Sequence, residues 1–467
     1  MSDSRPTVAV IGGGLSGTLV AVNLMRYAAR PLEVVLMESS GDFGPGIAYS
    51  SRDPQHRLNV PAARMSAFQT APLHLLTWAS NHLGREVDGS EYLPRGLYGE
   101  YLRELLVDER TRSKVTAVEL IAGEAERIVR TRDGVLIEHG HGDAFAADAA
   151  VLATGNLPPA PLPNLPEDER IIVDPWAPGA LDRLIDTGTT VIIGASLTAV
   201  DLALTVARSA PRGRTIALSR SGLVPRSSLP GLREPAPPPS IPTGQMGLLP
   251  MKNFLSSHNR RMTAEGYDWR DVVDGIRPCI PGFWKCLSIA DRQQFLKGMA
   301  REWEVLRHRI APDAKVDLGW LRQAQRFEFR RARVESVVPA GRNLQVIVET
   351  AEGQDRISAD QIVCCTGVGT EIRRATGLIG HALEDGIAVS DPLGLGLRAG
   401  SCGALIDHTG SARGPIYAIG PLLRGELWET TAVREIRMQA EDIALDLCRG
   451  LNVLPPPASE IRMETGE

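Results

Sequence analysis

The apolar pattern at the start of the chain predicts a strand, a tight turn and a helix. Residues 7–11 are a short, β-branched apolar run, residues 12–17 read GGGLSG, and residues 18–29 have a helix-forming composition. A second apolar run at residues 33–38 predicts another strand, which ends in Glu38. A glycine turn between a strand and a helix, followed by an acid-ended strand, is typical of a dinucleotide-binding βαβ unit.

The same pattern occurs a second time. Residues 149–155 predict a strand that stops at Thr-Gly, and the proline-rich stretch at residues 156–167 predicts a crossing to another domain, because prolines cannot continue a helix or a central strand. Residues 189–209 then repeat strand, turn and helix, with GASLTA as the turn, and residues 360–367 repeat the strand ending in Thr-Gly. The chain therefore contains two copies of one plan. We expect an α/β fold with two Rossmann-like domains.

Two further regions are predicted from their apolar spacing, a helical insertion and a C-terminal strand, loop and helix. Residues 252–309 have mostly helical spacing and follow a second proline-rich stretch, which predicts a helical insertion at about 240–320. Residues 414–440 predict a short strand, a loop and a final helix that begins near Thr430 or Thr431. We expect one discontinuous domain at 1–160 and 371–455, a second at 161–370, and a flexible tail at 456–467.

Composition excludes several classes of function. The 467 residues are 43% hydrophobic and carry a formal net charge of −5, which argues against nucleic acid or an anionic membrane surface as a partner. No stretch is apolar enough to span a bilayer and the N-terminus lacks a signal pattern, so we expect a cytoplasmic protein. The six cysteines include no C-x-x-C pair, which predicts small buried thiols and no metal site. Assembly into a homo-oligomer is left open.

The first glycine turn has the residues expected around FAD. Gly12 permits the tight turn, Gly14 lets the backbone approach a pyrophosphate, and Gly17 lets the helix pack closely on the strand. Glu38 lies 21 positions beyond Gly17, near the offset at which a carboxylate meets the ribose hydroxyls. The candidate residues are Gly12, Gly13, Gly14, Leu15, Ser16, Gly17, Glu38 and Ser39.

The second turn differs in a way that favours NADPH. The strand that follows it ends in Ser219-Arg220-Ser221 and has no acid. Arg220, together with Arg226, suits a 2′-phosphate through charge-assisted hydrogen bonds. A solvated surface position is the alternative for Arg220. The other candidates here are Gly194, Ser196, Leu197 and Thr198.

Three further segments are placed to reach a bound cofactor. The loop at residues 56–68 follows the ribose-binding strand and is expected to run toward the reactive ring. The start of the final helix offers unpaired N–H groups suited to negative charge on a reduced flavin. The candidates in the loop are Leu58, Asn59, Val60 and Met65, and those before the final helix are Gly420, Leu427, Trp428, Thr430 and Thr431. The Thr-Gly ends of the two predicted strands add Thr154, Gly155, Thr366 and Gly367. The basic cluster at residues 307–309 is expected to face a cofactor phosphate or an acidic substrate, or to be a solvated helix end.

These motifs resemble those of flavoproteins with two dinucleotide-binding domains. That group includes single-component flavin monooxygenases, N-hydroxylating monooxygenases and pyridine-nucleotide disulfide reductases. The stretches FGPGIAYS, RLNVPAARMSAF, PRGLYGEYL, SRSGLVPR, RHRIAP and LWETTAVREIR are similar to a bacterial family known only as FAD/NAD(P)-binding proteins. The resemblance implies FAD and NADPH as cofactors.

Missing motifs narrow the reactions that the resemblance implies. No cysteine pair suits a disulfide reductase, and residues 170–176 contain Asp174 but no histidine where Baeyer–Villiger enzymes have one. What remains is hydroxylation of an amine nitrogen or another soft nucleophile by a flavin C4a-hydroperoxide, with molecular oxygen and a small amine or amino acid as partners.

The catalytic candidates follow from position in the chain. They are Asn59 beside the flavin ring, and Arg424 and Glu429 for substrate contact; the last two have the alternative of capping or bracing the final helix. A flavin reductase that passes electrons from NADPH to another acceptor, and a non-catalytic FAD-binding protein, are the alternative functions.

Overall fold

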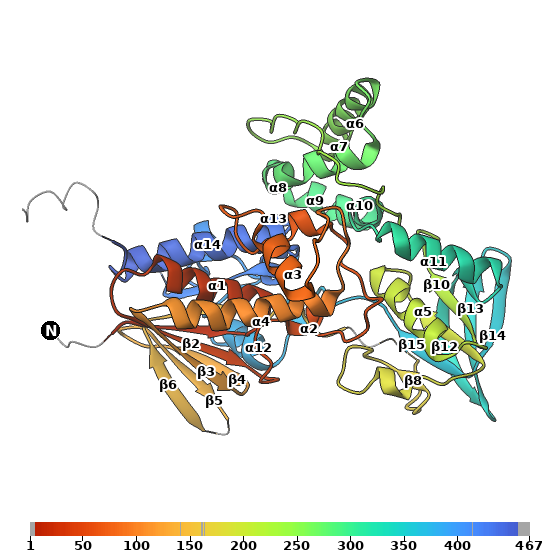
Figure 1. Ribbon diagram of the computed structural model, residues 1–467, viewed down its shortest axis with the longest axis horizontal. Coiled ribbons are helices and arrows are strands. Elements are labelled where there is room, and N and C mark those ends of the chain that lie inside the picture. The colour runs from red at the N-terminus through yellow and green to blue at the C-terminus, as the bar shows by residue number, and fades with distance from the viewer. Residues whose placement is uncertain (1–4, 141, 160–161, 163, 413, 456–467) are drawn as a thin grey trace, which may run out of the picture.

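Two parallel sheets organise the chain (Figure 1). The computed structural model describes residues 5–140, 142–159, 162, 164–412 and 414–455. The first sheet has the order β16 (Ile416–Ala418), β7 (Ala149–Leu152), β1 (Thr7–Ile11), β2 (Leu32–Glu38) and β3 (Thr116–Ala122). The second has the order β11 (Phe327–Arg331), β10 (Arg214–Ser219), β9 (Thr189–Ile193), β15 (Gln361–Cys364) and β8 (Ile171–Ile172). The predicted α/β fold with two Rossmann-like domains is confirmed.

The two Rossmann-like halves have the same hydrogen bond and the same glycine turn at the end of their central strand. The N–H of Ala153 donates to the last residue of β1, and the N–H of Cys365 donates to the last residue of β9, both at 2.8 Å. Gly12 and Gly194 have φ of +104° and +126°. A Cβ at Gly12 would lie 2.4 Å from the Ala153 oxygen, and one at Gly194 would lie 2.1 Å from the Cys365 oxygen. Both turns therefore require glycine, for the backbone angle and for the close approach.

Alternation along each central strand separates two cores. In β1, Val8 and Val10 face a cluster formed with helices α1 (Leu15–Tyr27), α4 (Arg95–Arg112) and α14 (Val433–Gly450). Ala9 and Ile11 face the opposite cluster, which includes α12 (Gly377–Glu384) and the antiparallel strands β4 (Ala125–Arg130), β5 (Val135–His139) and β6 (Asp143–Ala147). The sheet is thus covered on both faces, as parallel sheets require.

The second sheet is built in the same way. Ile192 on β9 faces α5 (Leu197–Ser209) and α11 (Pro312–Gln323). Val191 and Ile193 face the antiparallel strands β12 (Arg333–Ala340), β13 (Asn343–Thr350) and β14 (Gly353–Ala359). Each half therefore consists of a parallel sheet, helices on one face and a three-stranded meander on the other.

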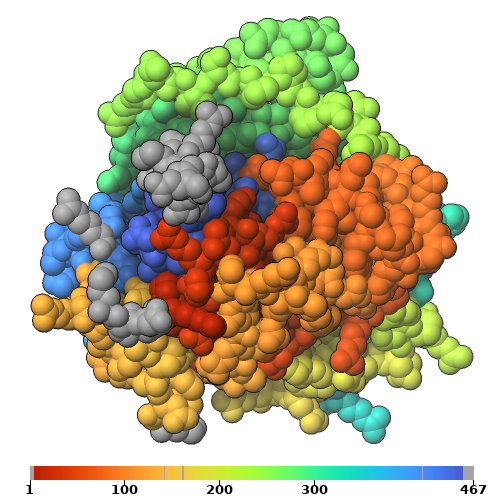
Figure 2. Space-filling view, turned by 60° about the vertical axis from the view of Figure 1, so that its left-hand side comes forward, coloured from red at the N-terminus to blue at the C-terminus, as the bar shows by residue number. Residues whose placement is uncertain are grey.

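A group of helices projects above the two sheets (Figure 1). It comprises α6 (Leu248–Ala264), α7 (Trp269–Ile276), α8 (Ile280–Cys286), α9 (Ile289–Gly298) and α10 (Ala300–Arg307). Helix α7 begins with a capping box, in which the Asp268 side chain accepts the backbone N–H of Asp271 and the Asp271 side chain accepts the backbone N–H of Asp268. Figure 2 shows these green helices next to the blue C-terminal segment and the red N-terminal one. In the described part of the chain, no helix is long and apolar enough to cross a membrane.

Several element boundaries differ from the sequence predictions. The first helix begins at Leu15 and not at residue 18, and α14 begins at Val433 and not at Thr430 or Thr431. Strands β11 and β12 follow each other directly in the chain but belong to different sheets, because β11 joins the parallel sheet and β12 starts the meander. The tail at 456–467 lies outside the described residues.

The chain crosses between the sheets at two adjacent places. Leu157 and Gly369 form an isolated antiparallel bridge, which joins the segments that follow β7 and β15. The carboxyl ends of both Thr-Gly strands therefore lie beside the crossing. The exact domain limits at 160/161 and 370/371 stay a prediction.

Candidate functional site

The first glycine turn leaves donors open at the carboxyl edge of the first sheet. Gly14 precedes α1 and no side chain caps that helix. The N–H groups of Leu15, Ser16 and Gly17 have no acceptor among the described residues. Since the start of a helix carries partial positive charge, this edge suits an anion.

Glu38 lies next to this turn, at the end of β2. One carboxylate oxygen accepts the N–H of Gly13 at 2.8 Å, and the other accepts the N–H and hydroxyl of Ser40 at 3.1 and 2.9 Å. Ser39 also donates to it at 3.3 Å. The carboxylate is therefore held at the place where the ribose of an adenine dinucleotide lies in this fold.

The C-terminal segment lies beside the same turn. A Cβ at Gly420 would lie 3.2 Å from the Ser16 hydroxyl. Thr430 is fully buried and donates to the Gly420 oxygen at 2.9 Å, while Gln439 binds both Thr430 and the Gly420 N–H at 2.8 and 2.9 Å. Thr430 thus holds the loop in place, and Thr431 is exposed just before α14. Gln439 was not predicted, because no local pattern distinguishes it from other polar residues of the helix.

The loop at 56–68 presents one free polar group. Leu58 and Met65 are buried, and Asn59 and Val60 are partly buried. The N–H of Leu58 donates to Leu93 at 2.8 Å. The side-chain amide of Asn59 forms no hydrogen bond with any described residue, so it is available to a ligand.

The second turn also opens at a carboxyl edge. Ser196 precedes α5, and its side chain does not cap the helix that Leu197 and Thr198 begin. Thr154 and Thr366 are exposed at the ends of β7 and β15, and Gly155 and Gly367 follow them. The two halves thus offer equivalent edges on either side of the crossing.

Two arginines gather at the end of β10 and β11. Arg220 is exposed and forms no hydrogen bond or ion pair with a described residue. Arg331 lies opposite Ser219 in the strand pairing, and its Cδ lies 3.1 Å from where a Cβ of Gly222 would be. The basic ending of the strand at 327–331 was the signal for Arg331 that the sequence analysis missed.

Arg226 contacts the helical insertion, and its contact with a 2′-phosphate stays a prediction. Its guanidinium lies 5.3 Å from the centre of the Trp269 ring. Arg270 covers the same ring at 4.4 Å, so Arg226 is part of a stack at the helical insertion.

Arg424 and Glu429 both contact helix α10. Glu429 is 6% exposed and accepts from Trp303 Nε1 at 2.8 Å and from Arg307 Nε at 2.5 Å. Arg424 donates to Glu304 at 3.0 Å. These contacts hold the loop before α14 against α10, and both substrate contact and bracing of the final helix by the two residues stay predictions.

The segment between them turns sharply. Leu427 is partly buried and ends the short helix α13 (Arg424–Leu427). Trp428 has φ +61° and ψ −60°, and the N–H of Glu429 donates to the Leu427 oxygen at 2.8 Å. This is a γ-turn with a positive central φ, a strained conformation for a tryptophan. Its ring stacks on Trp284 with 5.1 Å between centres.

The basic cluster at 307–309 is neither a solvated helix end nor a free phosphate site. The Arg307 side chain is 4% exposed and paired with Glu429. Arg309 is buried and pairs with Asp274 at 2.7 Å. Burial is the main cause that lowers the pKa of His308 well below its usual value, and the positive charges of Arg307 and Arg277 lower it further. The expectation of solvation was wrong because these side chains point into the interface with α7 and the C-terminal segment.

A buried polar cluster connects the two halves. His56 is fully buried; its Nδ1 contacts the Ser51 hydroxyl at 2.6 Å and its Nε2 contacts the Thr205 hydroxyl at 2.8 Å. Thr205 donates to Asp53 at 2.6 Å, and Arg208 donates to the same carboxylate at 2.8 Å. Asp53 precedes the loop at 56–68 and His56 begins it, whereas Thr205 and Arg208 lie on α5.

A second ion pair lies in the same interface. Arg95 at the start of α4 lies 2.9 Å from the carboxylate of Asp201 on α5. Burial raises the pKa of Asp201 to about 6, although Arg95 acts in the opposite direction. Burial lowers the pKa of His56 to about 4, against the nearby Asp53. These contacts fix α5, whose N-terminus is the second glycine edge.

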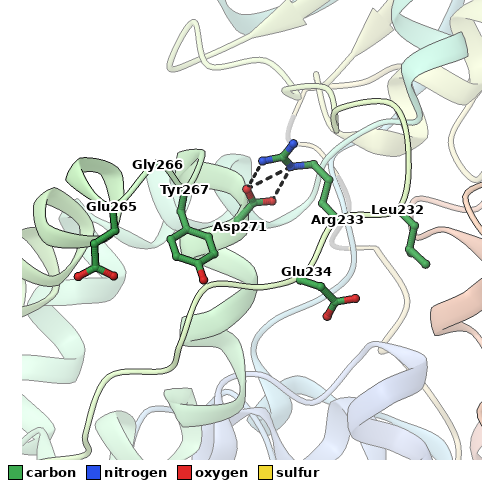
Figure 3. Close-up of a pocket in the computed structure, with 7 residues that line it drawn as sticks. All are labelled: Leu232, Arg233, Glu234, Glu265, Gly266, Tyr267 and Asp271. Atoms are coloured by element: carbon green, nitrogen blue, oxygen red, sulfur yellow. Dashed lines mark hydrogen bonds and ion pairs between the residues drawn. The ribbon is translucent and has the colours of Figure 1, made fainter.

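A hollow of about 350 Å³ lies elsewhere, on the helical insertion (Figure 3). Arg233 and Asp271 face each other in it and are joined at 2.5 Å. Leu232, Glu234, Glu265, Gly266 and Tyr267 complete its lining. None of the residues predicted to bind a cofactor lies there.

Comparisons with known proteins agree with this architecture. Residues 9–157 match the sequence model of a family described as FAD-NAD(P)-binding. No curated protein matches the sequence.

Solved structures match over the whole length. The cadaverine monooxygenase of desferrioxamine biosynthesis from Erwinia amylovora, bound to FAD, is 14% identical with a TM-score of 0.65, over 100% of this chain and 99% of that one. The ornithine N-hydroxylase of Kutzneria sp. 744, with reduced FAD, NADP⁺ and L-ornithine, is 16% identical with a TM-score of 0.60, over 96% and 99%. The bacillithiol disulfide reductase of Bacillus cereus is 14% identical with a TM-score of 0.53, over 96% and 100%. At these identities the likeness shows the fold, which monooxygenases and reductases share.

Proposed function

We propose that this chain is an NADPH-dependent, FAD-containing monooxygenase that hydroxylates an amine nitrogen, or another soft nucleophile, of a small molecule. The observation that carries the proposal is the contrast between two equivalent glycine edges, one next to Glu38 and the other next to Arg220. The first suits a permanently bound FAD and the second a 2′-phosphorylated nucleotide. The N-hydroxylases among the structural neighbours, which act on ornithine and cadaverine, support the reaction class.

The residues on the first edge fit FAD. The open N–H groups of α1 would hold the pyrophosphate, and Glu38 the ribose. Asn59, whose amide has no partner among the described residues, and Thr431, which lies just before α14, would lie along the flavin. The flavin, when bound, accepts hydride from NADPH and activates oxygen, while the protein orients the reactants and excludes water.

The second edge fits NADPH on the same grounds. The uncapped start of α5 would hold the pyrophosphate, with Arg220 and Arg331 at the 2′-phosphate. The buried cluster around His56 would keep this edge in a fixed orientation toward the first one.

The alternative of a disulfide reductase lacks its reactive group. All six cysteines are free, and the adjacent Cys364 and Cys365 are buried at the end of β15. Burial raises the pKa of Cys364 to about 11, which disfavours the thiolate that such a reaction needs. An NADPH-dependent flavin reductase with another acceptor, and a non-catalytic FAD-binding protein, remain the competing functions.

A coupled assay separates these functions. We expect the purified protein to be yellow and to oxidise NADPH faster with an amine or amino acid in a screen, with a hydroxylated product that matches NADPH consumed and little hydrogen peroxide released. Fast oxidation of NADPH with quinone or ferricyanide, but no hydroxylated product with any amine, would support the reductase. A colourless protein that takes up no flavin would contradict both enzymatic functions. We also propose a cytoplasmic location, which supplies NADPH.

A further inference from the structure

An apolar cavity of about 160 Å³ lies inside the helical insertion. Helices α6, α8, α9 and α10 form its walls, and Trp428 of the C-terminal segment closes one side. Its main lining side chains are Met251, Phe283, Trp284, Phe295, Trp303 and Trp428. Lys252 and Glu302 are the charged residues in the lining.

The tryptophans present apolar faces to this cavity. Trp284 Nε1 donates to the Gly425 oxygen at 2.7 Å, and Trp303 Nε1 donates to Glu429 at 2.8 Å. These two N–H groups are therefore satisfied by protein acceptors, and apart from Lys252, Glu302 and the N–H of Trp428 the lining side chains are apolar. A water molecule needs two to four such partners to be stable in a cavity.

The backbone at Trp428, which places a ring in the cavity wall, is strained. Trp428 adopts a strained γ-turn to place its ring against Trp284 and, edge-on, against Phe295 at 5.2 Å. Strain of this kind is typical of ligand-binding sites. An unfilled cavity also loses the dispersion contacts of its lining side chains. Engineered cavities of about 150 Å³ lined by Leu, Ile and Phe stay dry and bind benzene.

We propose that this cavity binds a planar, uncharged apolar group between benzene and indole in size. The volume is too small for the face of a protein helix. A cationic ligand is disfavoured, because the rings of Trp284 and Trp428 already have the guanidinium groups of Arg292 and Arg424 at 5.1 and 4.7 Å from their centres and so are not free for a second cation. The proposal does not rest on the redox reaction; the group belongs either to a separate ligand or to the apolar end of the substrate.

Binding of toluene to the purified full-length protein tests the proposal. We expect a saturable change in tryptophan fluorescence and a rise in Tm, whereas benzylammonium should bind at least tenfold more weakly. Absence of saturable toluene binding up to its solubility, or equal binding of benzylammonium, would overturn the proposal.

A matched pair of variants locates the site. Met299→Trp fills the cavity from its lining and should weaken toluene binding at least tenfold. Met438→Trp makes the same change at a position that is 42% exposed on α14 and should leave binding unchanged. Equal binding by both variants contradicts the assignment. Should Met299→Trp fail to fold, ¹⁹F NMR of fluorobenzene with wild type and with Leu255→Phe, a smaller change in the lining, gives the same comparison.

The two sources of the group are distinguished by competition. If toluene competes with an amine that drives product formation, the cavity holds the apolar end of the substrate; if both bind together, it holds a separate ligand. Both results are consistent with a binding site in the cavity. The toluene test is independent of the proposed function, because binding is measured without NADPH turnover.

Discussion

Arg220 has no hydrogen-bonding or ionic partner in the part of the chain that the structure describes, whereas Arg307, Arg309 and Arg424 each have one. We expect Arg220→Ala to weaken NADPH binding about 10- to 100-fold and to change NADH binding little, because a charge-assisted hydrogen bond contributes about 1.5–3 kcal/mol. Titration of both nucleotides against the FAD-loaded protein measures this. Arg322→Ala, at an exposed position on α11, is the control. Equal losses for NADPH and NADH would contradict the assignment of the 2′-phosphate to this edge.

Gly17 is required because there is no room for a side chain between α1 and the glycine turn. A Cβ at this position would lie 1.8 Å from the Gly12 oxygen. We therefore expect Gly17→Ala to displace α1 from β1 and to abolish FAD retention, measured as the flavin-to-protein absorbance ratio.

Gly319 provides the matched control for that change. It lies inside α11, and an added Cβ would meet nothing within 4 Å. Gly319→Ala should raise the free energy of unfolding by about 0.5–1 kcal/mol and leave the flavin content unchanged. An unaltered flavin content in Gly17→Ala would show that the turn tolerates a side chain.

At the scale of elements, the pairing between α10 and the C-terminal segment carries the next prediction. Glu429→Gln would remove the closest charged partner of the buried Arg307 and leave only the more distant Glu435, at 3.9 Å. It should destabilise the protein by about 3 kcal/mol in urea unfolding. Glu304→Gln breaks the more exposed pair with Arg424 and should cost less than about 1 kcal/mol. A Glu429→Gln protein of normal stability that has lost turnover would instead support substrate contact by Glu429.

The same elements show how far the sequence could predict this structure. The glycine turns, Glu38 and the strands ending in Thr-Gly follow from residues that are neighbours in sequence, so local patterns were sufficient. The partners of His56 and Glu429 lie 149 and 122 positions away, at Thr205 and Arg307. A single sequence contains no local signal for such contacts. The turn at Trp428 was missed because side-chain packing, and not local preference, imposes its angles.

The interface between the two halves should respond to pH in two opposing ways. In the folded state the pKa of His56 is lowered to about 4, so this residue adds stability as pH rises from about 4 to 6.5. The pKa of Asp201 is raised to about 6, so its contribution falls as pH rises from about 4 to 6. In the native protein, these two opposing changes in the free energy of unfolding partly cancel. Asp53, Arg95 and Arg208 are the other charged groups that face this pair.

Removing either group should expose the slope of the other. Relative to wild type, His56→Gln should become less stable as pH rises through that window, and Asp201→Asn should become more stable, each by about 3 kcal/mol at most. Urea unfolding at several pH values measures both differences. Slopes of the same sign in the two variants would contradict the opposing titrations.

The first sheet is completed by the end of the chain. Strand β16 pairs with β7, and Tyr27 on α1 donates to Glu441 on α14, 414 positions later, at 2.5 Å. At ribosomal rates, roughly 20–80 s separate the synthesis of these two residues. During this time one edge of β7 and one face of α1 lack their partners, although the glycine turn is already made. We therefore expect stable flavin incorporation only after residues 416–450 have been made, and we expect nascent chains that lack them to be exposed to chaperones and proteases without the cofactor.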